Sequence, residues 1–220
     1  MYQRTRIKVC GITDCETALI AANAGVDAIG LVFYPRSSRF VELQKAADIL
    51  AVLPPFVTTV ALFVDPDEAE VNRVVDALDI TCLQFHGKES GTFAQQFGLP
   101  YVAAIRAGQL DPQQRMLRIK DHARASGFLY DSFDPVKVGG TGHTFDWSRF
   151  DRDVKGATLA GGLTPDNVKE AITLLRPWAV DVSSGVESAP GTKCPQLIAR
   201  FIEQCKIADD SVQLSVANTR

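Results

Sequence analysis

Short apolar runs of strand length recur along the chain and alternate with longer segments that have helical spacing. Eight runs have the length of a strand, at 7–9, 28–33, 57–64, 81–85, 101–105, 127–130, 157–160 and 180–182. Between most of them, apolar residues recur every three or four positions, at 15–24, 43–53, 68–78, 90–97, 167–175 and 196–207. Strands that alternate with helices are typical of a parallel sheet. We therefore predict eight parallel strands.

Several of the predicted helices have recognisable ends. Asp14 precedes the first helix, and the Asp65-Pro66 and Thr164-Pro165-Asp166 segments precede two others. These residue types are typical of helix starts. Gly25 and Gly98 follow helical segments, where a left-handed residue is favoured. The helix after the sixth strand is expected to be missing or very short.

The distribution of polar residues favours a closed barrel over an open, doubly wound sheet. Nearly every apolar run is followed at once by polar residues or glycine, whereas an open sheet gathers its functional residues at one switch point. Eight units in 220 residues give roughly 28 residues each, near the short end for this fold. We predict an α/β protein with a single (β/α)₈ TIM barrel at 1–208 and a loose, polar tail at 209–220.

Charge and hydropathy exclude several classes of partner. The 26 acidic and 23 basic residues give a net charge of -3 and are mixed along the chain, so nucleic acid and anionic membranes are not expected partners. Charges interrupt every apolar run well short of the ~20 residues of a membrane span. The polar first residues lack the apolar core of a signal peptide, which predicts a cytoplasmic protein.

The cysteines indicate neither a metal site nor a disulfide framework. There are five, an odd number, and the sequence has no Cys-x-x-Cys pair. A buried cysteine in a reducing compartment usually behaves as a small apolar residue. Only local context can mark one of them as functional.

Three glycine-rich segments late in the chain predict a phosphate site. They are 139–142, 160–163 and 183–186, which follow the sixth, seventh and eighth predicted strands. Each alone is compatible with a simple turn. Together they suit a phosphate held by backbone N–H groups, as in the recurring phosphate site of such barrels, and 139–142 is expected to form a mobile lid. The candidate phosphate-binding residues are Gly140, Gly142, Gly161, Gly162, Ser183, Ser184 and Gly185.

Two further strand ends carry groups suited to proton transfer. Lys8 and Cys10 lie on one face of the first predicted strand, and Cys10 ends it at the mouth of the barrel. Its thiolate, if stabilised by cations, can act as a base. Asp131 ends the sixth strand, where burial can keep a carboxyl protonated as an acid, although a capping or turn role is equally open.

Five motifs in order resemble the phosphoribosylanthranilate isomerase family of tryptophan biosynthesis. They are KVCGIT at 8–13, GLVFYPRSSR at 30–39, QFHG at 84–87, GGL at 161–163 and DVSSGVE at 181–187. The likeness spans residues 6 to about 205. The pattern departs at Phe85, where leucine is usual, and at Cys194, where a charged residue is common.

This resemblance implies an Amadori rearrangement of N-(5-phosphoribosyl)anthranilate without a cofactor or metal. By similarity, Asp131 protonates the ring oxygen of the sugar and Cys10 removes the proton from C2. Arg39 faces the anthranilate end, where its fixed charge suits a carboxylate. Gln84 and His86 line the pocket, and Asp181 bonds a sugar hydroxyl or orients the base.

Other readings stay open. An indole-glycerol-phosphate synthase-like lyase would share the phosphate loops but needs a lysine acid with a glutamate partner. A non-catalytic barrel could bind a phosphate ligand without turnover. A second sugar-phosphate substrate, the aminoimidazole carboxamide ribotide of histidine biosynthesis, is also undecided. The partner is in each case a phosphorylated small molecule, and the chain acts as a monomer or a homodimer.

Overall fold

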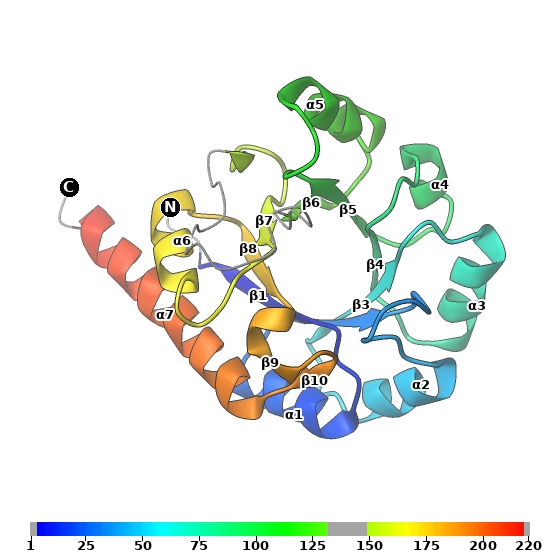
Figure 1. Cartoon of the computed structure of the whole chain (residues 1–220), viewed down its shortest axis with the longest axis horizontal. Coiled ribbons are helices and arrows are strands. Elements are labelled where there is room, and N and C mark those ends of the chain that lie inside the picture. Colours follow the sequence, from blue (N-terminus) through cyan, green and yellow to red (C-terminus); the bar gives the residue numbers. More distant parts are fainter. Residues whose placement is uncertain (1–3, 132–148, 218–220) are drawn as a thin grey trace.

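The computed structural model describes residues 4–131 and 149–217, and it contains a closed barrel of eight parallel strands (Figure 1). Each strand pairs with the next in sequence, and β1 pairs with β8 to close the ring. Each predicted run overlaps one strand, so the predicted barrel is confirmed. The strands are β1 (Arg6–Cys10), β2 (Ala28–Val32), β3 (Thr58–Phe63), β4 (Cys82–Phe85), β5 (Tyr101–Arg106), β6 (Gly127–Asp131), β7 (Thr158–Ala160) and β8 (Ala179–Val182).

Helices surround the barrel, and several begin and end at the predicted residues. Asp14 caps α1 by accepting from the Thr17 N–H, and Gly25 ends that helix with φ of 100°. Asp67 and Glu70 form a reciprocal capping box at α3. The helices are α1 (Cys15–Ala24), α2 (Leu43–Ala51), α3 (Glu68–Ala77), α4 (Gly91–Gln95), α5 (Pro112–Asp121), α6 (Val168–Leu175) and α7 (Pro195–Ala217).

The connections after β5 and β6 are the two that the prediction did not describe correctly or that lie partly outside the described residues. Helix α5 was not predicted, because its sequence is mostly polar and none of its ten side chains is buried. It depends instead on a capping box between Asp111 and Gln114 and on Pro112 in its first turn. The expected missing or short helix after β6 falls largely on 132–148, outside the described residues. In the described part of that connection, 149–157, no residue is α-helical.

The prediction of a loose tail from residue 209 is wrong up to Ala217, because α7 continues without a break through that residue. Asp209 is buried and accepts hydrogen bonds from Thr5 N at 2.9 Å and Thr5 Oγ1 at 2.8 Å. Val212, one turn further, is also buried. A polar residue that looked solvated in the sequence therefore ties the last helix to the start of β1.

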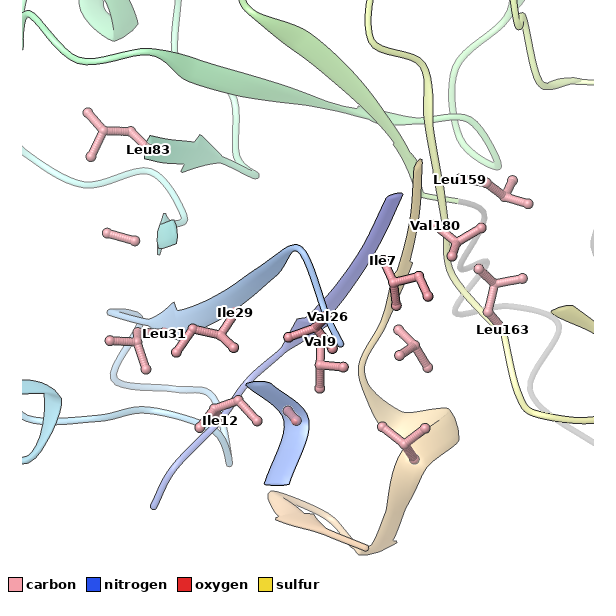
Figure 2. Close-up of a cluster of buried hydrophobic side chains, with 14 of the residues drawn as sticks. Ile7, Val9, Ile12, Val26, Ile29, Leu31, Leu83, Leu159, Leu163 and Val180 are labelled. Carbon is pink, nitrogen blue, oxygen red and sulfur yellow. The ribbon is translucent and has the colours of Figure 1, made fainter. Parts of the chain in front are cut away.

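Side chains of the strands alternate between two layers. One face packs against the helices in a large apolar cluster, of which Figure 2 shows Ile7, Val9, Ile29 and Val180. The other face points into the barrel, where Cys10 packs with Val32 and Leu62. Buried polar residues, among them Lys8, Gln84 and Asp181, also lie on strands. A barrel interior that holds charged groups is unusual for a purely structural core.

Candidate active site

A cavity of about 450 Å³ opens at the carboxyl ends of the barrel strands. Its walls include the last residues of β1, β2, β6 and β7. Among the predicted site residues, the lining includes Cys10, Arg39, Gln84, His86, Asp131, Gly161, Gly162, Asp181, Ser183 and Ser184. The structure thus brings the proposed base, acid and late glycine turns to one cavity.

Cys10 lies beside a buried ion pair. Lys8 Nζ is 3.0 Å from both carboxylate oxygens of Asp181, which lies opposite Lys8 on the neighbouring strand β8. The side chains of Lys8 and Asp181 are only 11% and 7% exposed, so water screens their charges weakly. Lys8 Nζ and Cys10 Sγ both approach Gly30, since a Cβ there would lie 3.1 and 2.9 Å from them. A cation held in this way can stabilise a thiolate.

Burial and charge act against each other on these three groups. Burial raises the pKa of the Cys10 thiol, while the charge of Lys8 and, to a lesser degree, that of Lys193 act to lower it. Burial acts to lower the pKa of Lys8, but Asp181 and Cys10 together raise it above its ordinary value. Burial raises the pKa of Asp181 despite its bonds to Lys8. Lys8 therefore stays charged, and Cys10 is a basic thiolate once it has lost its proton.

Gly30 makes room for the Cys10 thiol, a role that was not predicted from sequence. It lies opposite Cys10 in the pairing of β1 with β2. A Cβ at this position would lie 2.9 Å from Cys10 Sγ and 3.1 Å from Lys8 Nζ. The signal in the sequence was a glycine inside an apolar strand, which often marks a close approach.

Asp131 is held by a short chain of hydrogen bonds. Its Oδ2 lies 2.9 Å from His86 Nε2, and Gln84 Nε2 lies 3.2 Å from His86 Nδ1. Arg106 donates to the His86 carbonyl at 3.0 Å. Because the Gln84 amide donates to Nδ1, the ring proton lies on Nε2 and points at Asp131. His86 was predicted only as a wall residue, and the structure adds this contact with Asp131.

Arg39 and Lys193 share one carboxylate, Glu187. Arg39 Nε and Nη2 each lie 2.7 Å from a Glu187 oxygen, and Lys193 Nζ lies 2.7 Å from Glu187 Oε1. Burial acts to raise the pKa of Glu187, but the bonds from Arg39 and Lys193 lower it to about 2. Burial lowers the pKa of Lys193, whose side chain is fully covered. Neither Glu187 nor Lys193 was among the predicted site residues.

The predicted phosphate residues divide into three groups. Gly161 and Gly162 have φ of 80° and 66° and line the cavity together with Ser183 and Ser184. Gly185 is not among the lining residues, and a Cβ there would lie 1.8 Å from the Leu163 carbonyl oxygen, so its backbone packs tightly against the turn after β7. Gly140 and Gly142 lie outside the described residues, as does the predicted lid at 139–142.

The arrangement also bears on the lyase alternative. That chemistry needs a lysine and a glutamate that act together at the mouth of the barrel. Lys8 is instead bonded to Asp181, and both oxygens of Glu187 accept hydrogen bonds from Arg39. These contacts do not favour the lysine and glutamate pair that the lyase alternative requires.

Comparison with known proteins agrees with the geometry. The family model for N-(5'-phosphoribosyl)anthranilate (PRA) isomerase matches residues 7–204. The N-(5'-phosphoribosyl)anthranilate isomerase of Stutzerimonas stutzeri (strain A1501) is 48% identical over 202 residues, which cover 91% of this chain and 97% of the relative.

Solved structures give the same result. Phosphoribosyl anthranilate isomerase from Thermotoga maritima matches with a TM-score of 0.82 and 37% identity, over 92% of this chain and 98% of that chain. A phosphoribosyl anthranilate isomerase in complex with reduced 1-(o-carboxyphenylamino)-1-deoxyribulose 5-phosphate matches with a TM-score of 0.76 and 34% identity, over the same shares. The resemblance seen in the five motifs is confirmed, and this chain belongs to the N-(5'-phosphoribosyl)anthranilate isomerase family.

Proposed function

We propose that this chain isomerises N-(5'-phosphoribosyl)anthranilate to 1-(2-carboxyphenylamino)-1-deoxyribulose 5-phosphate, a step of tryptophan biosynthesis. One observation carries the proposal: Cys10 of β1 and Asp131 of β6 line the same cavity. Family membership supports the reaction. The related structure that holds a reduced form of the product supports a phosphorylated ligand.

The reaction needs one group that protonates the ring oxygen and one that removes a proton from carbon. Asp131 gives its proton to the furanose ring oxygen, the bond from that oxygen to C1 breaks, and the nitrogen lone pair completes a protonated Schiff base. Cys10, as the thiolate, then takes the proton from C2, and the electron pair moves to form an enolamine. Tautomerisation yields the ketone. Proton transfers alone complete the reaction, so its chemistry requires no cofactor.

Neighbouring groups assist both transfers. The positive charge of Lys8 acts to lower the pKa of Cys10 against the effect of burial, so it favours formation of the thiolate. The bond between His86 Nε2 and Asp131 Oδ2 stabilises the carboxylate that remains after Asp131 has given up its proton. Each catalytic group therefore has a neighbour among the described residues that favours its charged form.

The two ends of the substrate are assigned to different residues of the cavity. The phosphate is assigned to the turns with Gly161, Gly162, Ser183 and Ser184, where positive φ at both glycines permits close approach of the backbone. The anthranilate carboxylate is assigned to Arg39, whose planar guanidinium suits a carboxylate. The reacting carbons are assigned to the part of the cavity that Cys10 and Asp131 line.

The proposal also covers the cellular compartment and the oligomeric state of the enzyme. The five cysteines are all unpaired, as expected in a reducing compartment, which supports a cytoplasmic enzyme. Among the described residues, no helix is long and apolar enough to cross a membrane. The chain is proposed to act as a monomer or a homodimer.

The test is a fluorescence assay for consumption of phosphoribosylanthranilate by the purified protein. Cys10→Ala and Asp131→Ala should each abolish turnover while the reduced product analogue still binds, because these side chains transfer protons rather than anchor the ligand. Cys194→Ala and Asp76→Ala serve as controls, since Cys194 is only half-buried and Asp76 is exposed, and neither lines the cavity. Folded wild-type protein that converts nothing would refute the isomerase.

A further inference from the structure

Glu187 joins two parts of the site that are far apart in sequence. It begins a small hairpin made of β9 (Glu187–Ala189) and β10 (Thr192–Lys193), which follows the eighth barrel strand. The hairpin packs on the loop that carries Arg39, since a Cβ on Gly191 would lie 2.3 Å from the Ser38 carbonyl oxygen. Glu187 itself does not line the cavity, and its side chain is only 4% exposed.

Hydrogen-bond donors leave little freedom in this cluster. The three N–H donors of Lys193 face Glu187 Oε1 at 2.7 Å, Ser183 O at 3.1 Å and Ser183 Oγ at 3.3 Å. Lys193 therefore has no donor left for a ligand. Arg39 has five N–H donors, and it donates two of them, from Nε and from Nη2, to Glu187. Its remaining donors, the Nη1 hydrogens and the second Nη2 hydrogen, point away from Glu187 along the other edges of the guanidinium.

The path of the Arg39 side chain is also fixed. Arg39 crosses the end of β1, where a Cβ on Gly11 would lie 2.4 Å from Arg39 Cδ. Gly11 directly follows Cys10, so the Arg39 side chain passes next to the proposed base. Its guanidinium is then held by Glu187 in two parallel hydrogen bonds. Such bidentate pairs fix direction as well as distance.

We propose that Glu187 is a positioning residue that turns one edge of the Arg39 guanidinium toward the cavity and thereby makes the site select substrates with a carboxylate on their aromatic end. This inference rests on the proposed function and adds to it. The buried carboxylate balances two cations, Arg39 and Lys193, so a ligand carboxylate meets a guanidinium that is already oriented. Without that bond, Arg39 would lose both its partner and its direction.

The experiment compares two ligands in binding titrations of the wild-type enzyme and its variants. One is the reduced product analogue, and the other is the same compound without the ortho carboxyl group. Glu187→Gln keeps the size of the side chain, but its single carbonyl oxygen cannot serve three donors. The preference for the carboxylated ligand should fall by about tenfold or more. Affinity for the ligand that lacks the carboxyl group should stay within about twofold, because that ligand does not use Arg39.

Two further variants make the result specific. Glu187→Asp keeps the negative charge between Arg39 and Lys193 and so protects folding, but it withdraws the carboxylate by one methylene and should also reduce the preference. Glu203→Gln, an exposed glutamate on α7, should leave both affinities unchanged. If Glu187→Gln and Glu187→Asp weaken both ligands equally, or keep the wild-type preference, the inference is wrong while the isomerase stands. If the wild-type enzyme neither prefers the carboxylated ligand nor turns over substrate, the proposed function itself fails, and the inference with it.

Discussion

Replacing Lys8 with methionine tests whether a buried cation sustains the base. Methionine keeps the length of the side chain but removes a charge that lies 3.0 Å from both oxygens of Asp181. Removing one partner of a buried pair leaves the other charge uncompensated, which typically costs about 3–5 kcal/mol. Because a domain of this size has a total stability of roughly 5–15 kcal/mol, Lys8→Met should fold but with a much lower free energy of unfolding.

A double-mutant cycle measured by urea unfolding tests whether the charges of Lys8 and Asp181 stabilise each other, independently of their effect on the Cys10 thiol. Asp181→Asn alone should also destabilise the protein, because it leaves Lys8 buried without its counter-ion. The double variant Lys8→Met, Asp181→Asn should lose clearly less than the sum of the two, by about 1–3 kcal/mol, since no charge is then left unpaired. Strictly additive losses would contradict a coupled pair.

The pH dependence of the Lys8→Met variant has a definite sign. Burial already raises the pKa of Asp181 above its ordinary value, and the loss of Lys8 should raise it further. A group whose folded-state pKa is raised binds its proton more tightly when folded, so the free energy of unfolding of Lys8→Met should increase as the pH falls toward the pKa of unfolded aspartate. Urea midpoints at several pH values measure this slope.

The pH dependence of Cys10 alkylation measures how Lys8 affects the proposed base. The charge of Lys8 acts to lower the pKa of Cys10, so Lys8→Met should move alkylation of Cys10 by iodoacetamide to higher pH. A background with Cys15→Ser and Cys194→Ser removes the two half-buried thiols. Because Asp181→Asn removes a negative charge that raises the pKa of Cys10, alkylation should move to lower pH in that variant. Unchanged alkylation in Lys8→Met would refute a role for this cation in activating the base.

Three further predictions concern single residues. Gly30→Ala would put a Cβ 2.9 Å from Cys10 Sγ, so turnover should fall sharply and urea unfolding should show a loss of about 1–3 kcal/mol from overpacking. His86→Ala removes the contact with Asp131 at 2.9 Å, so kcat should fall by roughly tenfold or more while the reduced product analogue binds almost normally; equal losses in both would point to a collapsed pocket instead. Asp209→Ala removes both bonds to Thr5 and should cost about 1–3 kcal/mol in thermal or urea unfolding, whereas the adjacent, exposed Asp210→Ala should be neutral.

The fold was predictable from the sequence wherever the local pattern of apolar residues matches the residues that are buried in the structure. The eight strands are largely buried and apolar, and nearly every predicted run is followed by polar residues or glycine, so their number and order were predictable. Helix α5 was missed because it buries no side chain completely and depends on its capping box. The continuation of α7 was missed because Asp209 appears solvated in the sequence, whereas its buried partner, Thr5, lies 204 positions away.

The same limit applies to the site. Sequence indicated which residues stand at strand ends, because that property is local, and most of the predicted site residues line the cavity, although Gly185 does not. It did not indicate how they pair, because the partners of Lys8 and Arg39 lie 173 and 148 positions away. Glu187 and Lys193 were overlooked for this reason: both lie in a hairpin outside the barrel strands and are bonded to the lining residues Arg39 and Ser183.

The charges around Cys10 explain how a thiol with a raised pKa can serve as a base. Three cations, Lys8, Arg39 and Lys193, and two carboxylates, Asp181 and Glu187, are joined by the ion pairs beside it. This set has one excess positive charge, which a Cys10 thiolate neutralises. When a carboxylate of the substrate binds Arg39, it adds a negative charge that the thiolate must face in a weakly screened cavity. The added negative charge raises the proton affinity of the thiolate but also lowers the fraction of Cys10 that is ionised, so the charges of Lys8 and Lys193, which act to lower the pKa of Cys10, are what keep the base available when C2 must be deprotonated.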